Sequence, residues 1–198
     1  MNENPPEAAA AGVFHGARTV QEWQDREVET EVLQRLYEVL RAGPTSANGF
    51  PLRLVFVSSD SEKARVVETA MPSNRPCLEN APVVAIVAYD SRFFLDLPQR
   101  FPAAGESMKK LFESNDELAQ VNAFRNGTLQ GGYFLYAARA VGLDYAPMSG
   151  FDNAAVDAAF FPEGRIKSNF LCGLGYGRPE GLPAQPERPG WDEICRIV

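Results

Sequence analysis

The chain has 198 residues, of which 45% are apolar and 23% are charged, a balance typical of one folded domain with a sizeable core. The formal net charge of −7 disfavours a partner with a phosphate backbone, so we expect no binding to nucleic acid. No apolar stretch reaches the ~20 residues of a membrane helix. The N-terminal stretch is acidic and unlike a secretory signal, so we expect a cytoplasmic protein without membrane contact.

Residues 1–12 are rich in Pro, Ala and Glu, which predicts a disordered tail ahead of a single domain over 13–198. Apolar residues at helical spacing then predict a helix over 27–42. Thr30 is a candidate N-cap of this helix, and Gly43 followed by Pro44 is its predicted end.

The rest of the chain alternates strand and helix patterns. The stretch 91–115 is ambiguous, and its aromatic residues and prolines favour short helical pieces that form a cap. A long helix over 116–141 begins at Asn115 or Asp116 and ends at Gly142. The other predicted elements are strands over 52–58, 82–90, 143–148 and 168–177, and helices over 60–70 and 153–160, the last capped by Asp152. This order predicts a sheet covered by helices on both sides.

Two turns concentrate polar groups. The stretch "GPTSAN" places Thr45, Ser46 and Asn48 between a helix and a strand. In "YAPMSGFD", Pro147 is followed by Met148, Ser149 and Gly150, whose backbone amides are expected to be free. Hydroxyl and amide groups of this kind can bind a polar ligand chain or the edge of a planar ring. An ordinary turn would also use these residue types, and both interpretations stay open.

Two arginines are candidate phosphate ligands because a guanidinium binds phosphate with a planar fork of donors. Arg18, followed by Thr19, lies where the ordered chain is expected to begin, and Arg188 lies in a stiff proline-rich segment. The alternative for each is a solvated surface arginine.

Several common sites are disfavoured. The glycines of "GLGYG" at 173–177 come late and are followed by prolines, which favours a strand end over a dinucleotide loop. The only histidine is His15, so a catalytic triad or a His-rich metal site is not expected, and we predict no metal. The three cysteines form no CxxC motif, and two of them lie in apolar runs that indicate burial as reduced thiols.

Taken together, "GPTSAN", "VAIVAYD", "AFRNGTLQ", "PMSGFD" and "KSNFLCGLGYG" resemble the FMN-dependent nitroreductase family over about residues 13–198. Within the family the chain is most similar to the malonic semialdehyde reductase subgroup of pyrimidine utilisation. The resemblance implies an α+β three-layer sandwich with a mainly antiparallel central sheet. It also implies an intertwined homodimer that binds FMN at two sites between the subunits.

The resemblance further implies a set of residues that bind the cofactor. By matching position they are Arg18, Thr19, Ser46, Asn48, Asn74, Pro147, Met148, Ser149, Gly150 and Arg188. Ala17 and Gln21 stand where many relatives have basic residues, and Phe50 stands where many have Gln, which suits the aldehyde-reductase subgroup better than a generic nitroreductase.

The implied activity is a ping-pong hydride transfer. NADH or NADPH reduces the flavin at N5, and an acceptor then takes the hydride, so no catalytic side chain is needed. We expect malonic semialdehyde to be reduced to 3-hydroxypropionate. Arg125 is a candidate partner for the substrate carboxylate, with a helix-surface ion pair as its alternative. Competing interpretations are a broad nitroaromatic or quinone reductase and a non-catalytic flavin-binding dimer.

Overall fold

A four-stranded sheet in the order β1-β2-β4-β3 organises the protein in the computed structural model, which describes residues 13–14, 18–178, 180, 182 and 184–198. Every neighbouring pair of strands is antiparallel. The strands are β1 Leu52–Val57, β2 Val83–Asp90, β3 Asp144–Met148 and β4 Ile166–Gly175. The predicted tail at 1–12 lies outside the described residues.

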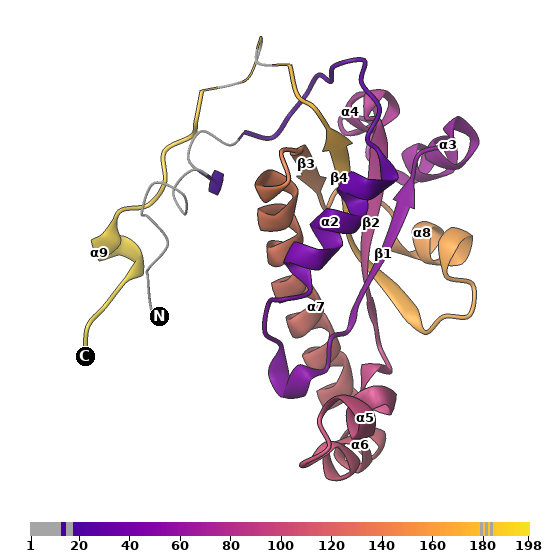
Figure 1. The fold of residues 1–198 in the computed structure, drawn as a ribbon, viewed down its shortest axis with the longest axis vertical. Helices are drawn as coiled ribbons and strands as arrows, with labels where there is room; N and C mark the ends of the chain where they lie inside the picture. The colour runs from indigo at the N-terminus through magenta and orange to yellow at the C-terminus, as the bar shows by residue number, and fades with distance from the viewer. Residues whose placement is uncertain (1–12, 15–17, 179, 181, 183) are drawn as a thin grey trace.

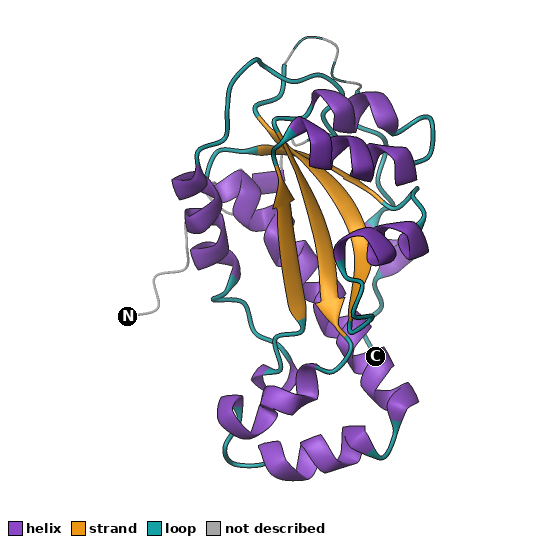
Figure 2. Ribbon diagram, turned by 90° about the vertical axis from the view of Figure 1, so that its right-hand side faces the viewer, coloured by secondary structure: helices purple, strands orange, loops and turns teal. Residues whose placement is uncertain are grey.

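The central strand β2 separates two hydrophobic cores. Because successive side chains of a strand point to opposite faces, Val83, Ala85 and Val87 enter one core, whereas Val84, Ile86 and Ala88 enter the other. Helices cover both faces, as Figure 1 and Figure 2 show. One face packs against α2 Thr30–Leu40 and α7 Asp116–Ala140, and the other against α3 Asp60–Thr69, α4 Arg75–Asn80 and α8 Asn153–Phe160. The three-layer α+β architecture is therefore confirmed.

A helical hairpin lies beyond one end of the sheet (Figure 2). It consists of η2 Phe93–Asp96, α5 Leu97–Arg100 and α6 Gly105–Glu113. Phe93, Phe94 and Phe112 form its own small core, with ring centroids of Phe93 and Phe112 5.3 Å apart. The prediction of short helical pieces over 91–115 is confirmed.

Most predicted elements are present, with some shifted boundaries. Thr30 is the first helical residue of α2 rather than its N-cap, because Glu29 occupies the cap position in an extended conformation. The strand predicted at 168–177 runs instead over 166–175. Asn115 and Asp152 cap α7 and α8 as predicted, each side chain accepting a backbone N–H from three residues later.

Two short helices were not predicted, α4 and α9 Trp191–Ile194. The second lies in a C-terminal arm, residues 184–198, which extends away from the sheet and its helices (Figure 1). Within the described residues, the hydrogen bonds of this arm are all local, and Trp191 is 66% exposed. Among the described helices, none combines the length and apolarity needed to span a membrane.

Candidate functional site

The end of β3 gathers several of the predicted residues. Gly150 O accepts hydrogen bonds from the Asn74 side-chain amide at 3.0 Å and from the Met71 backbone N–H at 2.9 Å. Within the described residues, the N–H groups of Ser149 and Gly150 donate to no acceptor. Unpaired donors beside a fixed amide can bind the polar edge of a planar ring.

Space at Gly150 is tight on one side. A Cβ atom built there would lie 2.8 Å from Asn74 Nδ2 and 3.0 Å from Met71 Sδ, so the glycine permits the close approach of these groups. Pro147, which cannot donate to a ladder, is tolerated because β3 is an edge strand. Met71 is itself exposed, so an apolar thioether borders the unpaired amides.

Val20 anchors Arg18 and Thr19 next to this strand. The Val20 N–H donates to Tyr145 O of β3 at 3.2 Å, and Cys77 Sγ of α4 contacts Val20 O at 3.2 Å. Arg18 is half-buried and has an interaction within the protein, whereas Thr19 is exposed. The structure therefore brings Arg18, Thr19 and the Asn74–Gly150 pair to one region around β3 and α4. His15 and Ala17 lie outside the described residues.

Ser46 and Asn48 lie elsewhere, in the short η1 turn Ser46–Asn48 that precedes β1. The Ser46 N–H donates to Asn126 Oδ1 of α7 at 2.9 Å, and the Asn48 amide donates to Arg100 O of the helical hairpin at 3.2 Å. Both residues are exposed.

The two groups lie at opposite edges of the sheet. β1 and β3 are the two edge strands, separated by β2 and β4 and hence by roughly 14 Å at the usual strand spacing. Met148, the last residue of β3, is level with Leu171 and Ile86, and Leu52 is level with Tyr89 further along β2, so both groups lie toward the same end of the sheet. One copy of the chain therefore does not bring all the predicted residues together.

The remaining predicted residues do not join either group. Arg188 lies in the exposed arm. Arg125 is exposed on α7 and makes no ion pair within the described residues, so the helix-surface ion pair considered for it is not found. Its guanidinium is thus available to an anion.

A buried charge network near the hairpin was not predicted. Asp90 is 1% exposed and receives Arg53 Nη2 at 2.6 Å and two donors of Arg165 at 2.8 and 2.6 Å. Burial alone would raise the pKa of Asp90, but the hydrogen bonds from Arg165 and Arg92 and the charges of Arg53 and Arg165 outweigh it and hold the pKa below its ordinary value. The network joins β1, β2 and the start of β4.

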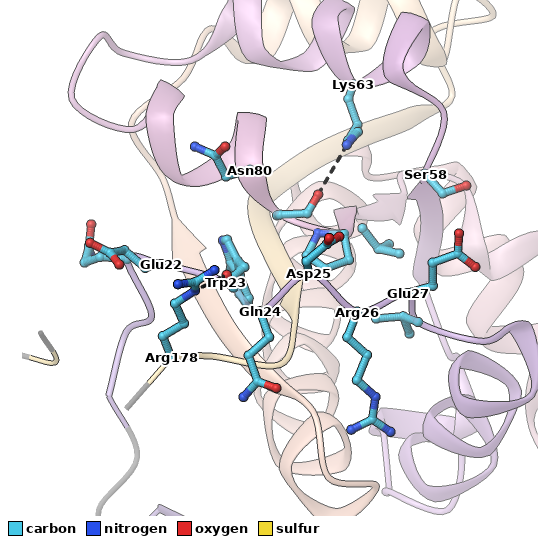
Figure 3. Close-up of a pocket in the computed structure, with 15 residues that line it drawn as sticks. Glu22, Trp23, Gln24, Asp25, Arg26, Glu27, Ser58, Lys63, Asn80 and Arg178 are labelled. Atoms are coloured by element: carbon cyan, nitrogen blue, oxygen red, sulfur yellow. Dashed lines mark hydrogen bonds between the residues drawn. The ribbon is translucent and has the colours of Figure 1, made fainter. Parts of the chain in front are cut away.

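A cavity of about 730 Å³ lies at the start of β2, at the end of the strand away from the hairpin, and Figure 3 draws the residues that line it. The cavity is lined by three basic residues, Arg26, Lys63 and Arg178, and their charges are balanced by Glu22, Asp25 and Glu27. Each basic residue already has a partner within the protein. Arg26 stacks on Tyr176 at 3.6 Å, Lys63 pairs with Asp60 at 3.3 Å, and Arg178 Nε donates to Trp23 O at 2.8 Å. None of the predicted cofactor residues lines it, so we do not assign the cofactor to this cavity.

The glycines of "GLGYG" serve packing. A Cβ at Gly173 would lie 2.9 Å from the Trp23 ring, and one at Gly175 would lie 2.7 Å from Pro82. The prediction that this motif is a strand end is confirmed, because β4 runs to Gly175. Cys77 and Cys172 are buried, also as predicted, and burial raises the pKa of both thiols.

Comparisons with known proteins agree on one family. Residues 15–176 match the model of the nitroreductase family. The chain is 47% identical over 190 residues to a Ralstonia pickettii protein that carries the provisional name NADH dehydrogenase/NAD(P)H nitroreductase HadB, covering 95% of this chain and 96% of that one.

Solved structures share the fold. A provisionally assigned nitroreductase of Bacillus subtilis, ydfN, has a TM-score of 0.88 at 17% identity, covering 96% of this chain and 99% of that one. A provisionally assigned nitroreductase of Exiguobacterium sibiricum, solved in complex with FMN, has a TM-score of 0.84 at 19% identity, covering 94% and 95%.

Proposed function

The chain belongs to the nitroreductase family, and from that premise we propose that it is an FMN-dependent oxidoreductase that uses NADH or NADPH to reduce a small electrophile. The observation that carries the proposal is the pair of unpaired N–H groups at Ser149 and Gly150, fixed beside the Asn74 amide. These groups fit the polar edge of a flavin ring.

FMN, when bound, supplies the hydride chemistry by accepting a hydride at N5 and passing it on. The chain's own task is to hold and orient it. In our proposal the Asn74 amide and the backbone from Pro147 to Gly150 bind the ring, and Arg18, Thr19 and Arg188 bind the phosphate. Amide donors at the ring edge favour the electron-rich form of the ring, because they stabilise negative charge that develops there.

We propose that the protein acts as a homodimer in which the turn holding Ser46 and Asn48 meets the end of β3 of a second copy. A twofold contact would bring opposite edges of two sheets together twice, forming two equivalent sites. The separation of the two edges within one chain supports this arrangement.

The exposed face of α7 supports the same proposal. Val121, Gly132 and Tyr136 share one stripe of this helix at helical spacing, opposite the buried face, and Phe124 beside them is 51% exposed. A Cβ built at Gly132 would meet nothing within 4 Å. Arg125 and Thr128 are also exposed on this face, so it is mixed in character, and the side chain absent at Gly132 leaves space for close contact with a second helix. The C-terminal arm, with exposed Trp191 and Ile194, is a second candidate contact.

The proposed substrate is malonic semialdehyde, reduced to 3-hydroxypropionate. With FMN bound, its carbonyl would gain a hydride from the flavin and a proton from water. Its carboxylate would pair with Arg125, which has no ion-pair partner within the described residues. The relatives are named nitroreductases, which favours a second candidate, the reduction of nitroaromatics in the same site, with quinones as further candidate acceptors.

A spectroscopic experiment tests the function. The purified protein should bind FMN, and NADH or NADPH added without oxygen should bleach the flavin absorption band. Malonic semialdehyde, a quinone or a nitroaromatic should then each restore the band, at different rates. A protein that binds no FMN would refute the proposal, and one that stays yellow with either nicotinamide would instead be a flavin-binding dimer without catalysis.

Arg125→Gln separates the two substrate classes. If the carboxylate binds Arg125, the KM for malonic semialdehyde should rise by about 10-fold or more, the scale of a lost charged hydrogen bond, while the KM for an uncharged quinone stays the same. Equal effects on both substrates would remove Arg125 from the substrate site.

A further inference from the structure

The turn that carries Ser46 and Asn48 has an unusual backbone. Ala47, Asn48 and Phe50 all have positive φ, at 51°, 51° and 46°, although none of them is glycine. Such residues are disfavoured sterically and persist only where the surroundings fix them. The glycine within the turn, Gly49, has an ordinary φ of −67°. Its lack of a side chain is needed for space, because a Cβ there would lie 2.9 Å from the Phe93 ring.

Side chains of α7 fix the two ends of the turn. Asn126 Oδ1 accepts the Ser46 N–H at 2.9 Å, and Gln130 Oε1 accepts the Leu52 N–H at 3.0 Å. Within the turn, Thr45 Oγ1 accepts the Phe50 N–H at 3.2 Å. These bonds place the turn relative to α7 but do not reach its middle carbonyl groups.

Arg100 binds those carbonyl groups from the helical hairpin. Its Nη1 donates to Gly49 O at 2.8 Å and to Phe50 O at 3.2 Å, while its Nη2 pairs with Asp96 at 2.9 Å. In the opposite direction, the Asn48 amide donates to Arg100 O at 3.2 Å. The turn and the hairpin are therefore joined by hydrogen bonds in both directions and by the contact of Gly49 with Phe93.

We propose that Arg100 is a positioning residue, which locks the turn at 45–50 to the hairpin and thereby sets how Ser46 is presented to the cofactor. The inference rests on the proposed function, in which this turn contacts FMN. The proposal also gives different roles to Ser46 and Asn48, which were both predicted to bind the cofactor. The Asn48 amide donates to Arg100 O, so Asn48 acts through the hairpin. The Ser46 hydroxyl has no partner within the described residues and is exposed, which leaves it available to the ligand.

Arg100→Met tests the proposal, because it keeps much of the apolar stem and removes the donors. Arg92→Met is the matched control, since Arg92 lies beside the same hairpin and its exposed guanidinium bonds to no described residue. The first readout is amide hydrogen exchange of Ser46 and Phe50 in the FMN-free protein. Arg100→Met should accelerate exchange at both amides by 10-fold or more, and Arg92→Met should leave it unchanged.

The second readout is FMN affinity, followed by titration of the FMN-free protein together with the visible circular dichroism of the bound flavin. We expect Arg100→Met to raise the FMN Kd about 10-fold or more and to alter the dichroism, with Arg100→Lys restoring part of both. Arg92→Met should match the wild type. If Arg100→Met fails to fold, Asp96→Asn replaces it, because it removes only the ion pair that orients Arg100 and should produce smaller changes in the same direction.

The inference would be overturned if Arg100→Met had the same amide exchange at Ser46 and Phe50, the same flavin dichroism and the same FMN Kd as the wild type. It would also be overturned if the melting temperature were the only property that changed. Failure of the proposed function is distinct, because it appears in the wild-type protein as an absence of FMN binding. The hydrogen-exchange result is independent of FMN and still tests whether Arg100 fixes the turn.

Discussion

Two adjacent glycines on α7 offer a direct test of the proposed dimer, because they lie on different faces of one helix. Gly132 is exposed, and a Cβ added there would have no neighbour within 4 Å, whereas a Cβ at Gly131 would lie 2.6 Å from the Phe170 ring. Alanine at either position improves helix propensity by about 1 kcal/mol. The two substitutions therefore differ only in what the added methyl group meets.

In an isolated subunit, Gly132→Ala should be stabilising by that ~1 kcal/mol, which corresponds to a rise of roughly 2–4 °C in Tm for a domain of this size. In a dimer that packs through this face, the methyl group enters a close helix contact in both copies. Overpacking costs about 1–3 kcal/mol at each site, so the dimer should weaken by at least about 2 kcal/mol, or roughly 30-fold in Kd.

Sedimentation over a dilution series, combined with melting curves at several protein concentrations, measures both effects. Gly131→Ala is the control, and it should lower Tm at all concentrations because its methyl group overpacks the subunit's own core. If Gly132→Ala dimerises like the wild type and melts at a higher temperature, this face of α7 is exposed to solvent and is not the contact. A wild-type protein that stays monomeric at micromolar concentration would refute the dimer itself.

Three further predictions concern other parts of the protein. Asp90→Asn should lower the free energy of unfolding by about 3–5 kcal/mol at neutral pH, since it leaves two arginines around a buried neutral group. The pKa of Asp90 in the folded protein is depressed below 3.8, so this difference in unfolding free energy should be complete above that pH and should shrink as the pH falls through the folded pKa. Urea titrations from pH 7 to pH 3 would follow it, and a difference that stays constant would argue against the ion pairs. Gly150→Ala should displace the Asn74 amide and weaken FMN binding by about 1–2 kcal/mol in the same titration of FMN-free protein, whereas unchanged binding would place the ring elsewhere. Arg188→Ala should weaken FMN retention by about 1–3 kcal/mol, and retention equal to the wild type would remove the C-terminal arm from the site.

The sequence predicts the layers of the fold well because the relevant signals are local. The run of β-branched residues in β2 and the caps at Asn115 and Asp152 each depend on a few neighbouring residues. The helix α4 was not predicted because its six residues are too few for an amphipathic repeat, even though Pro76 lies in its first turn, where proline is common. The arm helix α9 is shorter still, at four residues.

The candidate site is predicted only as a set of residue types. "GPTSAN" and "PMSGFD" indicate polar turns, but the strand order that sends them to opposite edges of the sheet depends on pairings between distant segments. The network around Asp90 is hidden for the same reason, because Arg53 and Arg165 are 37 and 75 residues away from it. Nothing local indicates that Arg100 binds the carbonyl groups of Gly49 and Phe50.

The two tryptophans occupy opposite extremes of exposure, at 5% for Trp23 and 66% for Trp191. Trp23 is wedged against β4 and donates its indole N–H to Cys77 O at 3.0 Å, so its fluorescence reports on the integrity of the folded core. Trp191 lies on the C-terminal arm, and its emission is sensitive to solvent and to anything that covers the arm. The chain thus carries two intrinsic optical probes, one for unfolding and one for the docking of its own C-terminus.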